Sequence, residues 1–363
     1  MHVVIAGGGS AGHIEPALAF ADALRRRDPA AQVTALGTER GLDTRLIPAR
    51  GYPLELIPPV PIPRRPGLDL LRVPGRLRRA VAAAAAVLRR TQADALVGFG
   101  GFVSGPAYLA ARRLRVPIVV HEANPRPGWA NRLGARFTTY VATSFPGTPI
   151  AHGRHLGLPI RTSIATLDRA ARRAEGRAAF GLEPDRPTLL VTGGSQGARR
   201  LNEAAAGAAA HLRAHGVQVL HATGSGHTVT VEDPGSSPPY VVVPYLDRMD
   251  LAYAAADLAL CRAGANTVVE LTAVGLPAAY VPLPIGNGEQ ALMARPVVEA
   301  GGGLMVDDAD CTPEWVRATL TPLLTDPTRL ATMGAAAAGS GRRDADERLV
   351  DLVLEAVEER RAR

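Results

Sequence analysis

Short apolar runs alternate with longer, periodically apolar segments along the whole chain. The short runs predict buried strands at residues 2–6, 32–36, 54–57, 95–99, 116–121 and 138–142, and then at 188–192, 218–222, 240–244, 258–261 and 278–282. The periodic segments predict helices between them, for example up to about residue 27 and over residues 267–274. Strands and helices that alternate in this way form parallel sheets, so we expect an α/β protein.

The pattern divides into two similar halves. Residues 145–161 are rich in proline and glycine and predict a linker, and the strand, glycine-rich loop and helix that open the chain are repeated from residue 188. We therefore expect one domain over residues 1–159 and a second over residues 160–341. A charged amphipathic helix is predicted at about residues 344–360.

Residues 257–284 predict a strand–loop–helix–strand unit with a candidate ligand site. The loop at residues 262–267 follows a buried strand and precedes a helix that stops at Gly275. Ligands of parallel sheets lie at this edge, where the N–H groups of a helix start suit a phosphate. Glu270 could accept hydrogen bonds from both hydroxyls of a ribose. The alternative is a capping box between Thr267 and Glu270, which satisfies the helix's own donors.

Three glycine-rich turns follow predicted strands, at residues 7–12, 98–101 and 193–197. The first matches G-x-G-x-x-G, but the acidic residue expected about 20 positions further on is missing, and the nearest is Glu39. This match alone is therefore only a weak indication of a dinucleotide cofactor. Glycine lets the backbone approach a ligand closely, so these turns either hold phosphate groups or are simply tight.

His13 begins the helix after the first glycine-rich turn and is the candidate general base. A helix N-terminus disfavours the imidazolium, so a histidine there tends to stay neutral and able to accept a proton. The alternative is a histidine that only packs against the sheet. Glu122 and Asn124 follow another predicted strand at the same edge, where they either line the site or cap its loops.

The charge of the chain favours an anionic partner. The net charge is +7 over 363 residues, and every one of the 41 basic residues is arginine, which binds phosphate through a planar fork. The segment from Arg64 to Arg90 combines many arginines with apolar residues, which suits either an anionic membrane surface or a helix with a solvated basic face. No basic–aromatic pattern or motif indicates a nucleic-acid partner.

Secretion, membrane spanning and metal binding are not indicated. The chain opens on a strand that leaves no room for a secretion signal, and no apolar stretch approaches about 18 residues. Cys261 and Cys311 form neither a disulfide framework nor a metal-ligand spacing, and no Asp-x-Asp pair lies in a suitable loop. We expect a cytoplasmic protein with no metal and no other cofactor.

Six motifs occur in an order that carries a family resemblance. They are GGSAGH at residues 8–13, GGFVSGP at 100–106, HEAN at 121–124, GLPIR at 157–161, GGSQGAR at 193–199 and CRAGANTVVE at 261–270. With these motifs the chain resembles the MurG family of N-acetylglucosaminyltransferases, from residue 3 to beyond residue 300. The resemblance implies the GT-B architecture, in which two Rossmann-like domains face each other across a cleft and residues 342–363 pack back on the first domain.

The resemblance also implies two substrates. UDP-N-acetylglucosamine (UDP-GlcNAc) would lie mainly in the second domain, and lipid I, the undecaprenyl-diphosphate-linked MurNAc-pentapeptide, would meet the first. Residues implied to bind substrate are Ser10, Ala11, Gly12, Asn124, Arg161, Ser195, Leu246, Ala265, Asn266, Thr267, Val268, Val269, Glu270 and Gln290. Among them Arg161 and Ser195 would meet the diphosphate, Leu246 the uracil, and Gln290 the sugar hydroxyls.

The implied reaction is an inverting transfer of N-acetylglucosamine to the 4-hydroxyl of MurNAc, with His13 as base, at the cytoplasmic face of the membrane. The chain departs from the family pattern at Ser10, where threonine is common, at Asn266, where an apolar residue is usual, and at Met293, where asparagine is frequent. Three alternatives stay open from the residues themselves: an NAD-dependent dehydrogenase, another nucleotide-sugar enzyme such as a UDP-GlcNAc 2-epimerase, and a non-catalytic nucleotide-sugar binder.

Overall fold

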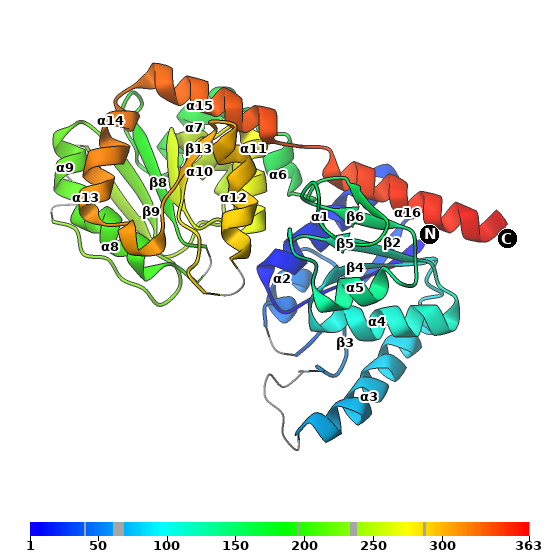
Figure 1. Cartoon of the computed structure of the whole chain (residues 1–363). Helices are drawn as coiled ribbons and strands as arrows, with labels where there is room; N and C mark the ends of the chain where they lie inside the picture. Colours follow the sequence, from blue (N-terminus) through cyan, green and yellow to red (C-terminus); the bar gives the residue numbers. More distant parts are fainter. Residues whose placement is uncertain (40, 61–68, 195, 233–237, 286–287, 363) are drawn as a thin grey trace. The chain divides into compact units, whose positions relative to one another are not determined.

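The computed structural model describes residues 1–39, 41–60, 69–194, 196–232, 238–285 and 288–362 (Figure 1). The chain forms two compact units. Unit 1 comprises Met1–Thr162 together with Asp344–Arg363, and unit 2 comprises Ser163–Arg343. Each unit has its own sheet and its own hydrophobic core.

The sheet of unit 1 is parallel, in the order β3-β2-β1-β4-β5-β6-β7. Its strands are β1 (His2–Gly7), β2 (Gln32–Gly37), β3 (Leu54–Leu56), β4 (Ala95–Gly100), β5 (Ile118–Glu122), β6 (Val141–Thr143) and β7 (Gly153–His155). The central strands are continuous apolar runs because helices bury both of their faces. The strand order reverses between β1 and β4, and such a switch point is where open parallel sheets bind ligands.

Helices from both ends of the chain cover the sheet of unit 1. One core layer joins the sheet to α1 (Ala11–Arg27), α2 (Asp43–Ala49) and α16 (Ala345–Ala362). The other joins it to α3 (Asp69–Arg90) and α4 (Gly101–Leu114), and α5 (Trp129–Gly134) packs beside α4. Leu349, Leu352 and Val353 of α16 are buried in the first layer, and Asp346 forms an ion pair with Arg26 of α1 at 2.7 Å. Apolar burial therefore assigns α16 to unit 1 (Figure 1).

Unit 2 repeats the same design, with the parallel strand order β10-β9-β8-β11-β12-β13. Its strands are β8 (Thr188–Thr192), β9 (Gln218–Ala222), β10 (Tyr240–Val243), β11 (Leu258–Cys261), β12 (Ala278–Tyr280) and β13 (Gly303–Met305). The α-helices from the boundary onward are α6 (Thr162–Ala165), α7 (Arg169–Ala179), α8 (Arg199–Gly207), α9 (Ala209–Ala214), α10 (Met249–Ala255), α11 (Ala265–Val274), α12 (Glu289–Glu299), α13 (Pro313–Trp315), α14 (Thr321–Leu324) and α15 (Pro327–Ser340). A 3₁₀ turn at Asp308–Asp310 and a π-helical turn at Val316–Leu320 complete the unit. The switch point lies between β8 and β11.

Two expectations about elements are corrected, and one strand was not predicted. Residues 145–161 are not only a linker, because they contain β7, which pairs with β6, and the buried Leu158 and Ile160. The strand expected at residues 138–142 begins only at Val141. β13 was missed because it follows the glycines at residues 301–302 and its apolar run is too short to predict a strand.

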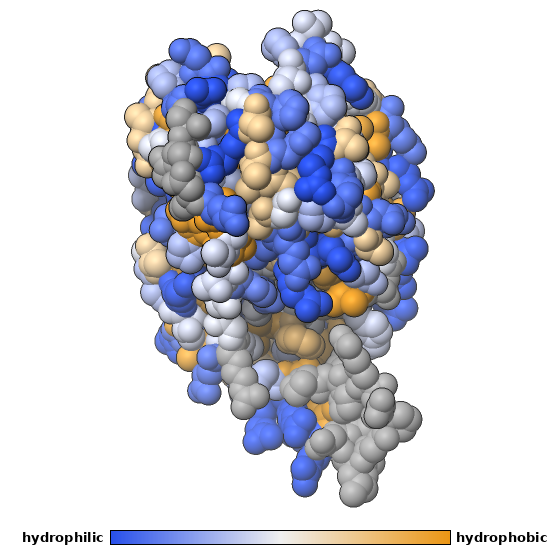
Figure 2. Space-filling view, turned by 90° about the vertical axis from the view of Figure 1, so that its left-hand side faces the viewer, coloured by the Kyte–Doolittle hydropathy of each residue, from blue (hydrophilic) through white to orange (hydrophobic). Residues whose placement is uncertain are grey.

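The surface seen in Figure 2 is mostly hydrophilic and carries scattered hydrophobic patches. None of the described helices is both long enough and apolar enough to cross a bilayer. Cys261 and Cys311 are buried and free. Within the described residues, no three His, Cys, Asp or Glu side chains gather in a way that suits a metal ion.

Candidate active site

Two glycine-rich turns meet at the switch point of unit 1, beside His13. Gly101 has a φ of +78°, and a Cβ on it would lie 2.6 Å from the carbonyl oxygen of Gly8. The buried Ser104 hydroxyl accepts from the Gly100 N–H at 3.0 Å and donates to the Ala6 carbonyl at 2.7 Å, which ties the two turns together. Glycine is therefore required where the two backbones touch.

Asp43, at the start of α2, holds the glycine-rich turn that follows β1. One oxygen of its buried carboxylate accepts from the Gly9 N–H at 2.8 Å, and the other accepts from the Thr38 N–H at 2.8 Å and the Thr38 hydroxyl at 3.2 Å. Asp43 was not predicted from the sequence. Its only local sign was an acidic residue in the first turn of a helix, which more commonly serves the helix itself.

His13 is the third residue of α1, as expected, and half-buried. Burial lowers its pKa, whereas the carboxylates of Glu122 and Asp43 and the Phe99 backbone act in the opposite direction. Burial dominates, so the imidazole is neutral at neutral pH. Its Nδ1 is buried and has no well-directed hydrogen bond to any described residue. A neutral imidazole at a ligand-binding edge has the properties that a general base requires.

Glu122 organises the loop that follows β5. Its buried carboxylate accepts from the backbone and side-chain N–H groups of Asn124 at 2.9 and 3.2 Å, from the Gly128 N–H at 2.8 Å and from the Asn131 side chain at 3.0 Å. Of the two interpretations of Glu122, the one in which its side chain caps the loop is confirmed. The half-buried Asn124 is held at the same edge of the sheet as His13.

The switch point of unit 2 brings the turn after β8 beside the start of α11. The predicted capping box is wrong, because α11 begins at Ala265 with Gly264 as its N-cap, and Thr267 therefore lies inside the helix. The N-cap residue, Gly264, has no side chain that could cap the helix start. Helix-start N–H groups of this kind suit an anion.

Glu270 of α11 takes its hydrogen bond from a neighbouring helix. The carboxylate is buried, at 7% exposure, and one oxygen accepts from the Tyr253 hydroxyl of α10 at 2.8 Å. Ala265, Asn266 and Thr267 are half-buried at the helix start, and Val268 and Val269 are buried in the core of the unit. The two valines can therefore meet a ligand only through their backbone.

The other predicted binding residues are distributed between the units. Leu246 is buried in unit 2, and Gln290 accepts from the Leu283 N–H at 2.9 Å. Arg161 lies in unit 1, where its guanidinium approaches the Glu15 carboxylate of α1 at 3.9 Å. Ser10, Ala11 and Gly12 open α1, with Ser10 as its N-cap. Ser195 lies outside the described residues, and Met293, at the position that departs from the family pattern, is buried.

A buried hydrogen-bond chain supports the turn after β8. The Asn202 side chain donates to the Thr223 carbonyl at 3.0 Å and contacts His221 at 3.0 Å, and the His221 ring contacts the Tyr240 hydroxyl at 2.9 Å. Gly197 in this turn and Gly224 in the turn after β9 pack backbone to backbone, since a Cβ on either would lie 2.2 Å from a backbone atom of the other turn. This turn is therefore fixed by unit 2 itself.

Acid is expected to destabilise both units through buried histidines. Burial lowers the pKa of His121 in unit 1 and of His221 in unit 2 to about 4. Each unfolded histidine binds a proton near pH 6.5, so the stabilising contribution is complete above pH 6.5 and is lost as the pH falls towards 4. We expect the free energy of unfolding to fall by about 3 kcal/mol per histidine by pH 4.

Urea unfolding at pH 7, 5.5 and 4 measures this loss. His221→Gln should flatten the pH dependence of unit 2, whereas His215→Gln, at an exposed position of unit 2, should leave it unchanged. An equal slope in His221→Gln and the unmutated protein would contradict the assignment.

Comparison with known proteins identifies the family. Residues 3–143 match the model of the glycosyltransferase family 28 N-terminal domain, and residues 188–349 match that of its C-terminal domain. A protein of Streptomyces avermitilis named UDP-N-acetylglucosamine–N-acetylmuramyl-(pentapeptide) pyrophosphoryl-undecaprenol N-acetylglucosamine transferase is 64% identical over 358 residues, which cover 98% of this chain and 99% of that protein. A protein of the same name from Streptomyces coelicolor is 63% identical, with 100% of both chains covered.

Solved structures confirm the α/β fold and the GT-B class that were expected from the sequence. The crystal structure of Acinetobacter baumannii MurG superposes with a TM-score of 0.76 at 30% identity, covering 98% of this chain and 99% of that one. A Neisseria meningitidis UDP-GlcNAc 2-epimerase has a TM-score of 0.62 at 13% identity, which shows a shared fold only. The six motifs, the two domain matches and the full-length relatives place the chain in the MurG family of glycosyltransferase family 28.

Proposed function

We propose that this protein transfers N-acetylglucosamine from UDP-GlcNAc to the 4-hydroxyl of MurNAc in lipid I, which forms lipid II for peptidoglycan synthesis. The observation that carries this proposal is the 64% identity, over nearly the whole of both chains, to a protein with that named activity. The site geometry is compatible with it, because a neutral histidine and two glycine-rich turns share one sheet edge of unit 1.

The donor is assigned mainly to unit 2. The start of α11, with the turn after β8 and Arg161, would hold the diphosphate, since helix N–H groups and guanidinium both bind phosphate. Glu270 would accept from the ribose hydroxyls, with its side chain oriented by Tyr253. Leu246 would contact the uracil, and Gln290 the sugar.

His13 acts as the base in this proposal. The imidazole takes the proton of the acceptor 4-hydroxyl while that oxygen forms a bond to the anomeric carbon. The bond from the anomeric carbon to the UDP oxygen breaks on the opposite face, and its electron pair leaves with UDP, so the configuration inverts. The sugar acquires oxocarbenium character, as in glycoside hydrolysis. The N–H groups of α11 and Arg161 stabilise the growing negative charge on UDP.

The acceptor is assigned to unit 1, near the membrane. The glycine-rich turns beside His13 would hold its diphosphate. The basic face of α3, with exposed Arg72, Arg78, Arg79, Arg89 and Arg90, would meet anionic lipid at the cytoplasmic face of the membrane. Arg64 and Arg65 of the predicted basic segment lie outside the described residues.

Two exposed aromatic side chains are expected to contact the acceptor's isoprenoid chain. Phe102 and Trp129 are 61% and 76% exposed, and they directly follow Gly101 and Gly128 of the site loops. Covering an aromatic side chain with hydrocarbon contributes about 1.5–3 kcal/mol, so Trp129→Ala should raise the KM for a long-chain acceptor about tenfold. The KM for a short-chain acceptor should change little. Trp315→Phe, at the other tryptophan, is the matched control, and an equal KM change for both chain lengths would contradict the contact.

The proposed function is tested by following labelled N-acetylglucosamine from UDP to a short-chain lipid I analogue, with UDP-sugar hydrolysis measured alongside. Formation of the lipid II-type disaccharide is the expected result. Donor binding without transfer would retain the nucleotide-sugar site and reject this acceptor. Failure to bind the donor would reject the proposed function as a whole.

A further inference from the structure

A cavity of about 950 Å³ opens on unit 1 away from the candidate active site. Its floor includes the buried Val116 and Ile118, at the amino end of β5, whereas Glu122 and the site loops lie at the carboxyl end of the same strand. The end of α4 and the last turns of α16 provide its walls. The cavity therefore belongs to neither substrate site described above.

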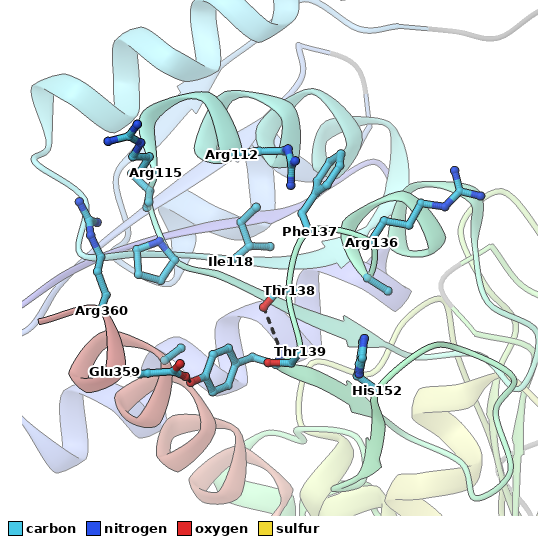
Figure 3. Close-up of a pocket in the computed structure, with 15 residues that line it drawn as sticks. Arg112, Arg115, Ile118, Arg136, Phe137, Thr138, Thr139, His152, Glu359 and Arg360 are labelled. Atoms are coloured by element: carbon cyan, nitrogen blue, oxygen red, sulfur yellow. Dashed lines mark hydrogen bonds between the residues drawn. The ribbon is translucent and has the colours of Figure 1, made fainter. Parts of the chain in front are cut away.

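Four arginines line the cavity. They are Arg112, Arg115, Arg136 and Arg360, and the lining contains a single acidic residue, Glu359. In the view of Figure 3, Arg115 and Arg360 lie on one side and Arg136 and His152 on the other, with Ile118 between them. The Glu359 carboxylate accepts a hydrogen bond from the Tyr140 hydroxyl, and four arginines against one carboxylate leave the lining with an excess of positive charge.

The four arginines have no carboxylate partner among the described residues. Many other arginines of the chain form ion pairs, but among the described residues none pairs with Arg112, Arg115, Arg136 or Arg360. Arg112 instead lies over the Phe137 ring, with its guanidinium carbon 4.6 Å from the ring centroid. A cation–π contact holds the guanidinium in place and leaves its N–H donors for another partner.

Two lining residues adopt a backbone conformation that glycine favours. Arg115 has a φ of +58° and His152 a φ of +60°, and Arg115 occupies the C-cap of α4, where glycine commonly ends a helix. A left-handed conformation is unfavourable for residues with a Cβ. Two of the three described non-glycine residues with a positive φ therefore line this cavity.

We propose that this cavity is a binding site for a phosphate-bearing ligand. Guanidinium groups bind phosphate oxygens through paired N–H donors, and the ligand would neutralise charges that no described carboxylate neutralises. Such a ligand would join α4, the start of β5 and α16, so its binding would also hold α16 on unit 1. The site is independent of the proposed transfer reaction.

Calorimetry with inorganic triphosphate tests the site, with saturating UDP present to occupy the donor site. We expect binding by the unmutated protein that weakens about tenfold for each of Arg112→Gln and Arg360→Gln, because each removes charge-assisted hydrogen bonds. Arg348→Gln, on the same helix α16 but outside the cavity, is the matched control and should bind like the unmutated protein. Unchanged melting temperature and unchanged transfer to a short-chain acceptor would show that the variants are folded.

A parallel experiment with phosphatidylglycerol vesicles distinguishes the source of the phosphate. Variant-sensitive binding of triphosphate assigns the site to a soluble ligand. Variant-sensitive binding of vesicles without triphosphate binding assigns it to a lipid headgroup. The proposal is overturned if the double variant Arg112→Gln/Arg360→Gln binds both probes as well as the unmutated protein does, or if the unmutated protein binds neither.

Discussion

Replacing His13 with alanine is expected to lower kcat about 10²–10⁴-fold, the usual contribution of a positioned general base. The affinity for UDP-GlcNAc should stay nearly unchanged, because the principal donor contacts are assigned to unit 2. Burial is the main reason that the His13 imidazole is neutral, and only the neutral ring can accept the acceptor's proton. Steady-state kinetics with a short-chain lipid I analogue, together with donor titration, measure both quantities.

The pH profile separates this role from a structural one. Since the pKa of His13 is lowered from 6.5, kcat/KM should rise with pH through an apparent pKa below 6.5. His13→Ala should lose this acid limb, whereas His215→Gln, at the exposed C-cap of α9, should keep both the rate and the limb. A His13→Ala enzyme that turns over like the unmutated protein would remove His13 from the mechanism.

Glu270→Gln is expected to weaken UDP-GlcNAc binding about 10–100-fold. A carboxylate that accepts two ribose hydroxyls makes charge-assisted hydrogen bonds worth about 1.5–3 kcal/mol each, and an amide replaces one acceptor with a donor. Tyr253→Phe should weaken binding only a few-fold, because Tyr253 orients Glu270 without touching the nucleotide. Calorimetric titration of UDP measures these affinities directly.

A structural role for Glu270 gives a different pattern. If the carboxylate served only the bond to Tyr253, Glu270→Gln and Tyr253→Phe would lower stability alike and leave UDP affinity unchanged. Measuring the free energy of unfolding alongside affinity therefore decides between the two roles. The Glu270 assignment fails if affinity is unchanged while stability falls.

Local pattern was sufficient to predict most of the fold. The buried strands of both sheets are continuous apolar runs, and the glycine-rich turns after β1, β4 and β8 stand directly behind them. Ligands bind at the carboxyl ends of the strands in a parallel sheet, and this rule predicted which loops lie together at that edge. His13 and Glu270 were predicted in this way.

Long-range contacts account for what local pattern could not predict. Asp43 holds Gly9 from 34 positions away, and no spacing rule connects the two. Glu270 fits the sequence spacing of a capping box, but its partner Tyr253 lies on another helix, and α11 starts before Thr267. β7 lies in a proline- and glycine-rich stretch, so only its pairing with β6 reveals it.

The position of α16 has a consequence for folding during synthesis. Unit 2, residues 163–343, lies in the chain between the two segments that form unit 1. Because the ribosome makes the chain from the N-terminus, unit 2 can complete its core before α16 emerges. Until then, the face of the unit 1 sheet that α16 covers, which includes core contacts of Leu349 and Val353, lacks that cover. The domain made first is thus the one finished last, and this interval is when a chaperone or the nascent chain itself must shield that apolar surface.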